Sequence, residues 1–394
     1  MKIDSTNKEI SDVIVGEGAA DSYKCYQCGK CMSVCPWYLV KAVDFVTYRI
    51  PQSVRLGTVT NSEDAERMAH EVEEIFRCLG CEACRSQCPH GVNIAEIVRS
   101  IRKVLFDYDA APPELKVAVG RVQSDGNPLG EPREKRNDWL KEIEYKKFDG
   151  TQEYAFYSCC TTAYDERLKK VGTAGVEILK RGGIDFGIIT DEEQNCCLEA
   201  VRRVGAMNVF QPLAEANIAL FSRLGIKKII TTSPHCYTIF KNEYGKIGEN
   251  LQMEPFHQAQ IFDRLIKERR IVPKNEMKKK IVYHDPCTLG RQNGIYDEPR
   301  NVLRSIPGVE LVEIPVFNRE YSICCSGGGG GVWLDRPINE RISDIRLKQA
   351  CDTGANILAV ACPYCLQMFE DSLKRVDCNI IVRDVAELLL DSII

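Results

Sequence analysis

Cysteine is the residue through which this sequence can do chemistry, with 20 copies among 394 residues. Eight of them form two copies of the run C-x2-C-x2-C-x3-C-P, which reads "CYQCGKCMSVCP" at 25–36 and "CLGCEACRSQCP" at 78–89. Such a run holds [4Fe–4S] cubanes, because three thiolates spaced by two residues surround one cluster while the fourth reaches the other cluster. The predicted ligands are Cys25, Cys28, Cys31 and Cys88 for one cubane, and Cys35, Cys78, Cys81 and Cys84 for the other.

Two alternative uses of these cysteines are less favoured. Pairs spaced C-x2-C also bind zinc, but zinc ribbons combine two such pairs and do not repeat a four-cysteine run that ends in Cys-Pro. A disulfide scaffold is disfavoured because the polar N-terminal stretch lacks the apolar core of a secretion signal, and cytosolic thiols stay reduced. We therefore expect a cytoplasmic iron–sulfur protein.

Composition excludes several partners. The net charge is −4 and no long basic stripe occurs, so nucleic acid is not an expected partner. No run of 18 or more apolar residues occurs, so we expect no direct membrane insertion and, at most, peripheral association through a partner. No nucleotide fingerprint stands in a strand-loop-helix context, so we expect no bound flavin or nicotinamide.

An internal repeat organises most of the remaining cysteines. "GIKKIITTSPHCYTIF" at 225–240 aligns without gaps to "GANILAVACPYCLQMF" at 354–369. The separations between equivalent cysteines are 127, 128 and 129 residues (160 to 287, 196 to 324 and 236 to 365), so the register holds throughout. The chain therefore contains two copies of one α/β unit.

The elements that must position these cysteines can be predicted from periodicity. Apolar strands are expected in the first copy at 153–159, 184–190 and 226–233, and in the second copy at 279–287, 309–316 and 355–362. Their alternation with helices indicates a parallel sheet, and each cysteine group follows a strand, at the carboxyl end where such sheets place their sites. N-terminally, helices are expected at 61–78, capped by Asn61 or Ser62, and at 91–108.

The predicted fold is an α+β multidomain protein. A helical domain with two [4Fe–4S] clusters occupies 1–110 and is more similar to α-helical ferredoxins than to the compact βαβ type. A Pro-, Gly- and charge-rich linker covers 111–150, with one short helix near "NDWLKEIEY". The two repeated lobes occupy 151–275 and 276–394.

The second lobe carries a resemblance to a known family. Its pattern C-x36-CC-x36-C-x2-C resembles the cysteine-rich CCG domain of the B-type and D-type polypeptides of heterodisulfide reductase, found also in iron–sulfur subunits of glycolate and lactate oxidation and of acyl-CoA-metabolising complexes. The whole chain is similar to the D-type polypeptide, a fusion of the C-type and B-type polypeptides. The resemblance implies a noncubane [4Fe–4S] cluster, with catalytic roles for Cys287, Cys324, Cys325, Cys362 and Cys365.

The first lobe departs from this pattern, because Ser233 stands where the second lobe has Cys362. Four cysteines suit a cubane, Cys159 could supply a fifth sulfur, and an empty or structural lobe is a further alternative. We expect an additional iron–sulfur cluster here. Its predicted ligands are Cys160, Cys196, Cys197 and Cys236.

The resemblance predicts an iron–sulfur oxidoreductase subunit that passes electrons through two cubanes to the CCG-domain clusters, with disulfide reduction at the noncubane cluster. The alternative is a non-catalytic electron-transfer subunit that links a flavin, quinone or haem partner to another subunit. A zinc-stabilised scaffold is a third, weaker hypothesis. The expected partners are therefore other subunits of a redox complex and a disulfide substrate.

Several further residues have two interpretations each. The glycine run 327–331 is either a mobile linker or, as we favour after a ligand pair, a close backbone approach to sulfide or substrate. His284 and Asp285 could relay protons, and a turn role for Asp285 is equally expected. His235 is expected to support the ligands, His257 to lie at the lobe interface, and Cys351 and Cys378 to be buried apolar residues.

Overall fold

The computed structural model describes residues 7–40, 47–58, 65–248 and 251–393. The chain divides into two compact units. Unit 1 comprises Met1–Val117, Ala200–Asn208 and Ser326–Ile342. Unit 2 comprises Ala118–Glu199, Val209–Cys325 and Ser343–Ile394. Two segments that follow the paired cysteines of the repeat thus belong to the same unit as the N-terminal domain.

The described residues of unit 1 form helices and loops without a β-strand. The helices are α1 (Asn7–Gly16), η1 (Ala19–Lys24), η2 (Met32–Val34), η3 (Pro36–Leu39), α2 (Arg49–Leu56), α3 (Ala65–Arg77), α4 (Ala83–Ser86), α5 (Ile94–Asp107), η7 (Gly331–Trp333) and η8 (Ile338–Glu340). The two predicted N-terminal helices correspond to α3 and α5. Asn93 caps α5 by accepting a hydrogen bond from the Glu96 N–H at 3.2 Å, whereas the predicted cap of α3 lies outside the described residues.

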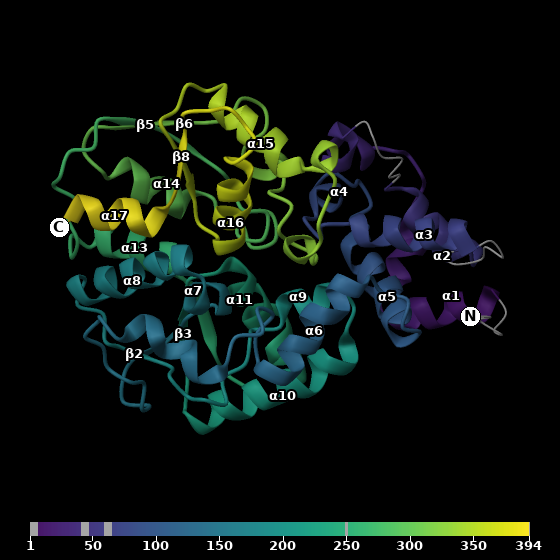
Figure 1. The fold of residues 1–394 in the computed structure, drawn as a ribbon, viewed down its shortest axis with the longest axis horizontal. Helices are drawn as coiled ribbons and strands as arrows, with labels where there is room; N and C mark the ends of the chain where they lie inside the picture. Colours follow the sequence, from purple (N-terminus) through teal and green to yellow (C-terminus); the bar gives the residue numbers. More distant parts are fainter. Residues whose placement is uncertain (1–6, 41–46, 59–64, 249–250, 394) are drawn as a thin grey trace. The chain divides into compact units, whose positions relative to one another are not determined.

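Unit 2 contains two parallel four-stranded sheets of identical topology (Figure 1). The first has the order β2-β1-β3-β4 and the second the order β6-β5-β7-β8. Each lobe therefore has one strand more than the three that periodicity predicts. The strands are β1 (Tyr154–Tyr157), β2 (Phe186–Ile188), β3 (Lys228–Thr231), β4 (Glu254–His257), β5 (Lys279–Tyr283), β6 (Val309–Val312), β7 (Ile357–Val360) and β8 (Ile381–Asp384).

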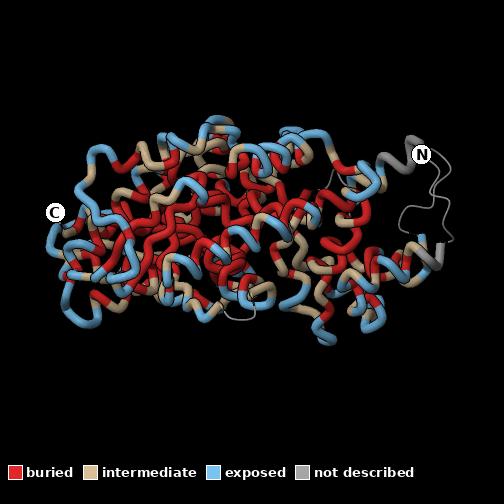
Figure 2. Tube along the Cα trace, turned by 90° about the horizontal axis from the view of Figure 1, so that it is seen from below, coloured by how far each residue is buried: buried red, intermediate tan, exposed pale blue. Residues whose placement is uncertain are grey.

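The sequence forms parallel strands because its central runs are apolar on both faces. The strands β1, β2 and β7 are buried along their whole length, and buried residues are red in Figure 2. The helices between and after these strands are α7 (Cys160–Tyr164), α8 (Glu166–Arg181), α9 (Glu199–Arg203), α10 (Met207–Arg223), α11 (Pro234–Ile239), η5 (Phe240–Tyr244), α12 (Gly245–Ile247), α13 (Gln258–Lys267), α14 (Asp297–Arg304), η6 (Arg319–Tyr321), α15 (Ile342–Cys351), α16 (Pro363–Ser372) and α17 (Val385–Ile393).

The two lobes share one hydrophobic core. Helix α8 packs against α17, and α13 packs against α14 (Figure 1). Each contact joins the helix after the first strand of one lobe to the helix after the last strand of the other, so the repeat is packed as a pseudo-symmetric pair. Phe156, Ile261 and Phe262 of the first lobe and Leu303 and Leu388 of the second belong to this core.

The segment 111–150 is more structured than the predicted linker. It contains α6 (Pro113–Asp125) and the 3-10 helix η4 (Arg133–Leu140). Leu115 and Val122 are fully buried, and Trp139 and Leu140 belong to the core of unit 2. Apolar residues spaced along a charged stretch therefore anchor this connection to the folded protein.

Two further findings concern membranes and disulfides. Among the described residues, no helix has both the length and the apolar character that a bilayer-crossing segment requires. Cys351 and Cys378, which the sequence predicts to be separate buried thiols, form a disulfide with their Cα atoms 6.2 Å apart. The prediction for this pair was wrong, because the end of α15 and the segment before β8 meet only in the folded lobe.

Candidate metal centres

The structure places the eight cysteines of the N-terminal runs in two neighbouring groups. In the first group, the pKa of Cys31 is raised to about 11 by burial and by the nearby thiols of Cys25, Cys28 and Cys88. The backbone N–H of Gln27 donates to Cys25 Sγ at 3.4 Å, and Cys28 is exposed at the surface. Four thiols of one group, with a backbone donor to sulfur, suit a cubane.

The second group surrounds a small pocket, which is also lined by Trp37 and Thr47. Burial raises the pKa of Cys35 to about 12, although a hydrogen bond with Thr47 opposes this. Four sulfurs around one cavity form the donor set that a cubane requires. The cysteines that line this cavity are Cys35, Cys78, Cys81 and Cys84.

Arg102 ties this second group to the rest of unit 1. Its side chain is 1% exposed, and its guanidinium donates to the carbonyl oxygens of Cys78 at 2.6 Å and Ile75 at 3.0 Å. It also donates to the carbonyls of Arg203 at 3.1 Å and Gly329 at 3.0 Å. One buried cation therefore joins the start of the second cysteine run to both segments that follow the paired cysteines.

The glycine run is packed against this same region. Gly329 and Gly330 have φ values of +62° and +86°, and Gly327–Gly330 are buried. A Cβ on Gly329 would lie 2.7 Å from the carbonyl oxygen of Cys78. The run is therefore a site of close backbone approach, as expected, but its neighbour is the peptide backbone at Cys78 and Leu79.

In the second lobe, five buried thiols form a continuous chain of contacts. The Sγ atoms of Cys287 and Cys324 are 3.8 Å apart, and those of Cys325 and Cys365 are 3.2 Å apart. The adjacent pair is in contact, and so are Cys362 and Cys365. Five buried sulfurs in one chain of contacts fit a thiolate-ligated cluster.

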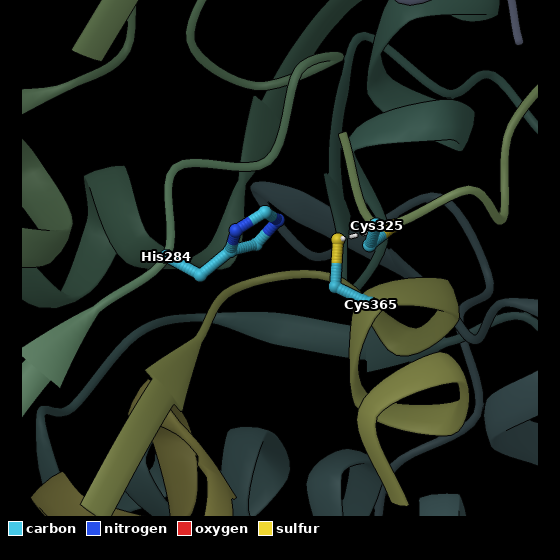
Figure 3. A group of neighbouring side chains, drawn as sticks. All are labelled: His284, Cys325 and Cys365. Atoms are coloured by element: carbon cyan, nitrogen blue, oxygen red, sulfur yellow. Dashed lines mark hydrogen bonds between the residues drawn. The ribbon is translucent and has the colours of Figure 1, made fainter. Parts of the chain in front are cut away.

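His284 completes the surroundings of this group. A nitrogen of its ring and the Sγ atoms of Cys325 and Cys365 all lie within 4.8 Å of one another (Figure 3). The guanidinium of Arg346 donates to His284 Nδ1 at 3.2 Å, so Nε2 carries the ring proton and faces sulfur. Burial lowers the pKa of His284 and keeps the ring neutral. Hydrogen bonds from Cys324, Cys365 and His284 lower the pKa of Cys325 well below its usual range.

The contacts of Asp285 fit the turn role that the sequence also predicts for it. Both of its oxygens accept hydrogen bonds from Arg300, at 2.6 and 2.8 Å, and the Arg319 N–H donates to it at 2.8 Å. A buried carboxylate with these partners positions the loop that carries the paired cysteines, because Ser322 also donates to the Asp285 carbonyl.

In the first lobe, the structure brings together the four predicted cysteines and Cys159. The Sγ atoms of Cys160 and Cys196 are 3.6 Å apart. Cys197 contacts both Cys196 and Cys236, while Cys159 contacts Cys160 and Cys236. Ser233 is not part of this group, because its hydroxyl accepts from the His235 N–H and caps α11.

Two histidines lie where the lobes meet. His235 Nδ1 is 2.8 Å from Glu199 Oε2, and its ring lies 4.8 Å from that of Tyr364 in the other lobe. Although burial opposes protonation, Glu199 and a hydrogen bond with Cys362 raise the pKa of His235 well above its usual range. His257 contacts the backbone of Thr232 and of Ala361 in the other lobe, and burial lowers its pKa to about 3.

Sequence reasoning missed three buried charged residues around these groups. Arg102 had a weak signal, because it follows Val98 and Ile101 on the apolar stripe of its helix. Glu199 and Arg346 had none, since a buried charge is recognised by its partner and those partners are distant in the chain.

Family models match three parts of the chain. Residues 154–241 and 281–370 match the cysteine-rich CCG domain, and residues 21–92 match a 4Fe-4S dicluster domain. These ranges include the groups of thiols described above.

Curated relatives align over most of the chain. The "Probable iron-sulfur-binding oxidoreductase FadF" of Bacillus subtilis is 30% identical over 95% of this chain and 60% of its own length. The "EtfAB:quinone oxidoreductase" of Syntrophomonas wolfei is 35% identical over 80% of this chain and 46% of its own length. The chain therefore spans about half the length of these two relatives.

The D-type polypeptide of the "Dihydromethanophenazine:CoB--CoM heterodisulfide reductase" of Methanosarcina barkeri is 28% identical, over 94% of this chain and 93% of its own length. Among solved structures, a hypothetical protein from Helicobacter pylori superposes with a TM-score of 0.52 at 10% identity, covering 99% of this chain and 73% of its own. This last similarity concerns the fold alone.

Proposed function

Because the chain belongs to the iron–sulfur proteins that join a 4Fe-4S dicluster domain to two cysteine-rich CCG domains, we propose that it is the iron–sulfur electron-transfer subunit of an oxidoreductase complex. The observation that carries this proposal is the arrangement of the cysteines in separate thiol groups, two of four in the dicluster domain and one of five buried thiols in the second lobe. Bound clusters would supply one-electron transfer and, at a noncubane centre, the reduction of a disulfide.

Different residues of the chain would hold the different clusters. The eight thiols of the dicluster domain would hold two [4Fe–4S] cubanes, and Arg102 would keep the ligand loop of the second in place. The five thiols of the second lobe would hold a noncubane cluster. His284 would present its Nε2 proton to Cys325, with Arg346 fixing the orientation of the ring.

Two observations bear on whether this chain itself turns over a disulfide. The hydrogen-bonded, buried second-lobe group resembles a reactive centre, and the similar polypeptide of Methanosarcina barkeri carries a heterodisulfide reductase name. Against this, Cys324, Cys325, Cys362 and Cys365 are all 1–3% exposed. Burial of this kind favours the second candidate, a subunit that relays electrons between a flavin, quinone or haem partner and another subunit.

The test is anaerobic purification followed by iron and zinc analysis and EPR spectroscopy. We expect at least ~12 iron atoms per chain, four for each cubane and four for the second lobe. Cys325→Ser should remove one EPR signal and leave those of the cubanes. Stoichiometric zinc without iron, or a Cys325→Ser variant with the spectrum of the parent protein, would overturn the proposal.

The two candidates are separated by adding a mixed disulfide to the oxidised protein. A shift of the signal that depends on Cys325 indicates that the disulfide reacts at the second lobe. An unchanged signal, with normal electron transfer through the cubanes to an artificial acceptor, identifies an electron-relay subunit.

A further inference from the structure

We infer that the first lobe is a complete five-thiolate site in which Cys159 replaces the cysteine missing at position 233, so that this lobe binds a tetranuclear iron–sulfur cluster of the same class as the second. This inference rests on the proposed function of the second lobe and extends it to the lobe that the sequence pattern leaves incomplete.

The order of sulfur contacts in the second lobe provides the reference. Starting at the cysteine after its first strand, Cys287 contacts Cys324, and Cys324 contacts its neighbour Cys325. Cys325 contacts Cys365, and Cys365 contacts Cys362. The chain of contacts therefore ends at the cysteine that has no counterpart in the first lobe.

The first lobe has the same order of contacts. Cys160 contacts Cys196, Cys196 contacts Cys197, and Cys197 contacts Cys236. Cys236 then contacts Cys159, which follows Cys236 as Cys362 follows Cys365 in the second lobe, and which also contacts Cys160. Cys159 is 5% exposed, and its Sγ lies 3.2 Å from the Thr161 hydroxyl, a potential donor to a thiolate.

Strand register explains how a residue so far away in the sequence can fill this place. Tyr157 of β1 pairs with Thr231 of β3 in the parallel ladder. Two residues beyond this pair, the chain reaches Cys159 on one strand and Ser233 on the other. The Cys159 N–H accordingly faces the Thr232 hydroxyl at 3.5 Å. A cysteine moved from one strand end to the adjacent one still reaches the same sulfur group.

The second lobe has the opposite arrangement at the equivalent pair of positions. Tyr283 of β5 pairs with Ala359 of β7, and three residues beyond them lie Pro286 and Cys362. The repeat offsets place Cys159 opposite Pro286, and Ser233 opposite Cys362. Each lobe thus has one cysteine at this pair of strand ends, which preserves the total of five.

The turn after the paired cysteines is also preserved, although only the second lobe has glycines there. Leu198 and Ser326 directly follow the two pairs and have φ values of +71° and +74°. A left-handed conformation is unfavourable for leucine, so its presence at Leu198 indicates that the surrounding structure holds this turn in place. The Leu198 N–H hydrogen-bonds to the sulfur of Cys196. A backbone donor to sulfur is the contact that a cluster ligand uses.

The experiment compares iron content and EPR spectra of three chains. Wild type should contain ~16 iron atoms. Cys159→Ser should lose up to ~4 of them, or change one EPR signal, while the signal that depends on Cys325 persists. The double variant Cys159→Ser/Ser233→Cys, which copies the second-lobe arrangement, should recover the iron. Retention of the cubane signals confirms that each variant is folded.

Three outcomes would overturn the inference. The first is a Cys159→Ser variant with the iron content and spectrum of wild type. The second is a wild-type chain with ~12 iron atoms and an intact second-lobe signal, which removes the inference and leaves the proposed function standing. The third is the absence of a second-lobe EPR signal from wild type, which contradicts both the inference and the proposed function. If Cys159→Ser does not fold, iron anomalous scattering from anaerobic wild-type crystals decides the question, because an iron atom must lie bonded to Cys159 Sγ.

Discussion

The buried guanidinium of Arg102 donates a hydrogen bond to the carbonyl oxygen of Gly329, 3.0 Å away, across 227 positions of sequence. The same guanidinium holds the carbonyl of Cys78, a predicted cubane ligand. The glycine run that follows the second cysteine pair is therefore a packed part of unit 1, held by the helix that follows the second cysteine run.

Replacing Arg102 with methionine should destabilise unit 1 by several kcal/mol. The substitution leaves buried carbonyls at Ile75, Cys78 and Gly329 without donors, and each orphaned group costs about 1–3 kcal/mol. We expect lower iron content and loss of the EPR signal of the second cubane. Lys103→Met on the same helix is the matched control, since its partly exposed pairs with Glu17 and Asp107 contribute about 0–1 kcal/mol. Equal thermal midpoints for the two variants would contradict this role for Arg102.

Gly329→Ala should be more damaging than Gly294→Ala. Both glycines are left-handed, with φ of +62° and +73°, so both substitutions incur a backbone cost of about 1–3 kcal/mol. Only at Gly329 does the added Cβ meet another segment, 2.7 Å from the Cys78 carbonyl, whereas nothing lies within 4 Å at Gly294. Thermal midpoints measured anaerobically should differ in that order. Equal thermal midpoints for the two variants would indicate that the glycine run 327–331 is a flexible linker.

His284→Gln should shift the reduction potential of the proposed second-lobe cluster downward by ~60 mV, the one-electron equivalent of a tenfold change in equilibrium constant. The reason is that the His284 ring, which lies beside the Cys325 sulfur, withdraws charge from that sulfur, and glutamine cannot reproduce the placement of the ring. EPR-monitored redox titration measures the shift, with iron content unchanged. Tyr157→Phe is the control, because Tyr157 is the first-lobe counterpart of His284, and it should leave the potential of the second-lobe cluster unchanged.

Acid should weaken the attachment of Ala200–Asn208 within unit 1. Arg202 pairs with Glu96 at 3.1 Å, and, although burial opposes it, the charges of Arg202 and Arg99 lower the pKa of Glu96 below its ordinary value of 4.5. A carboxyl with a lowered folded pKa adds stability above pH 4.5 that is lost as the pH falls through the folded value. The thermal midpoint of wild type should exceed that of Glu96→Gln at pH 7, and the difference should shrink below pH 4.5. A difference that is constant with pH would show that the pair contributes no electrostatic stability.

Much of the candidate site was predictable because its signals are local. The spacing of the N-terminal runs, the adjacent pairs Cys196-Cys197 and Cys324-Cys325, and the apolar strands before them are short-range patterns. The assignment of the eight N-terminal cysteines to two clusters stays a prediction of those patterns. The fourth strands, β4 and β8, escaped prediction because "EPFH" and "IVRD" are short and partly polar.

Local sequence is sufficient to predict the division of the cysteines into runs and repeats and the parallel lobes that carry the repeats. Covalent spacing and hydrophobic periodicity establish these features, since each depends on residues near one another in the chain. Which sulfurs meet depends instead on the folded arrangement. The register of β1 with β3 brings Cys159 into the place left by Ser233, and the packing of the lobes brings His235 to Cys362. Such contacts depend on strand order and lobe packing, which join residues without any local pattern between them.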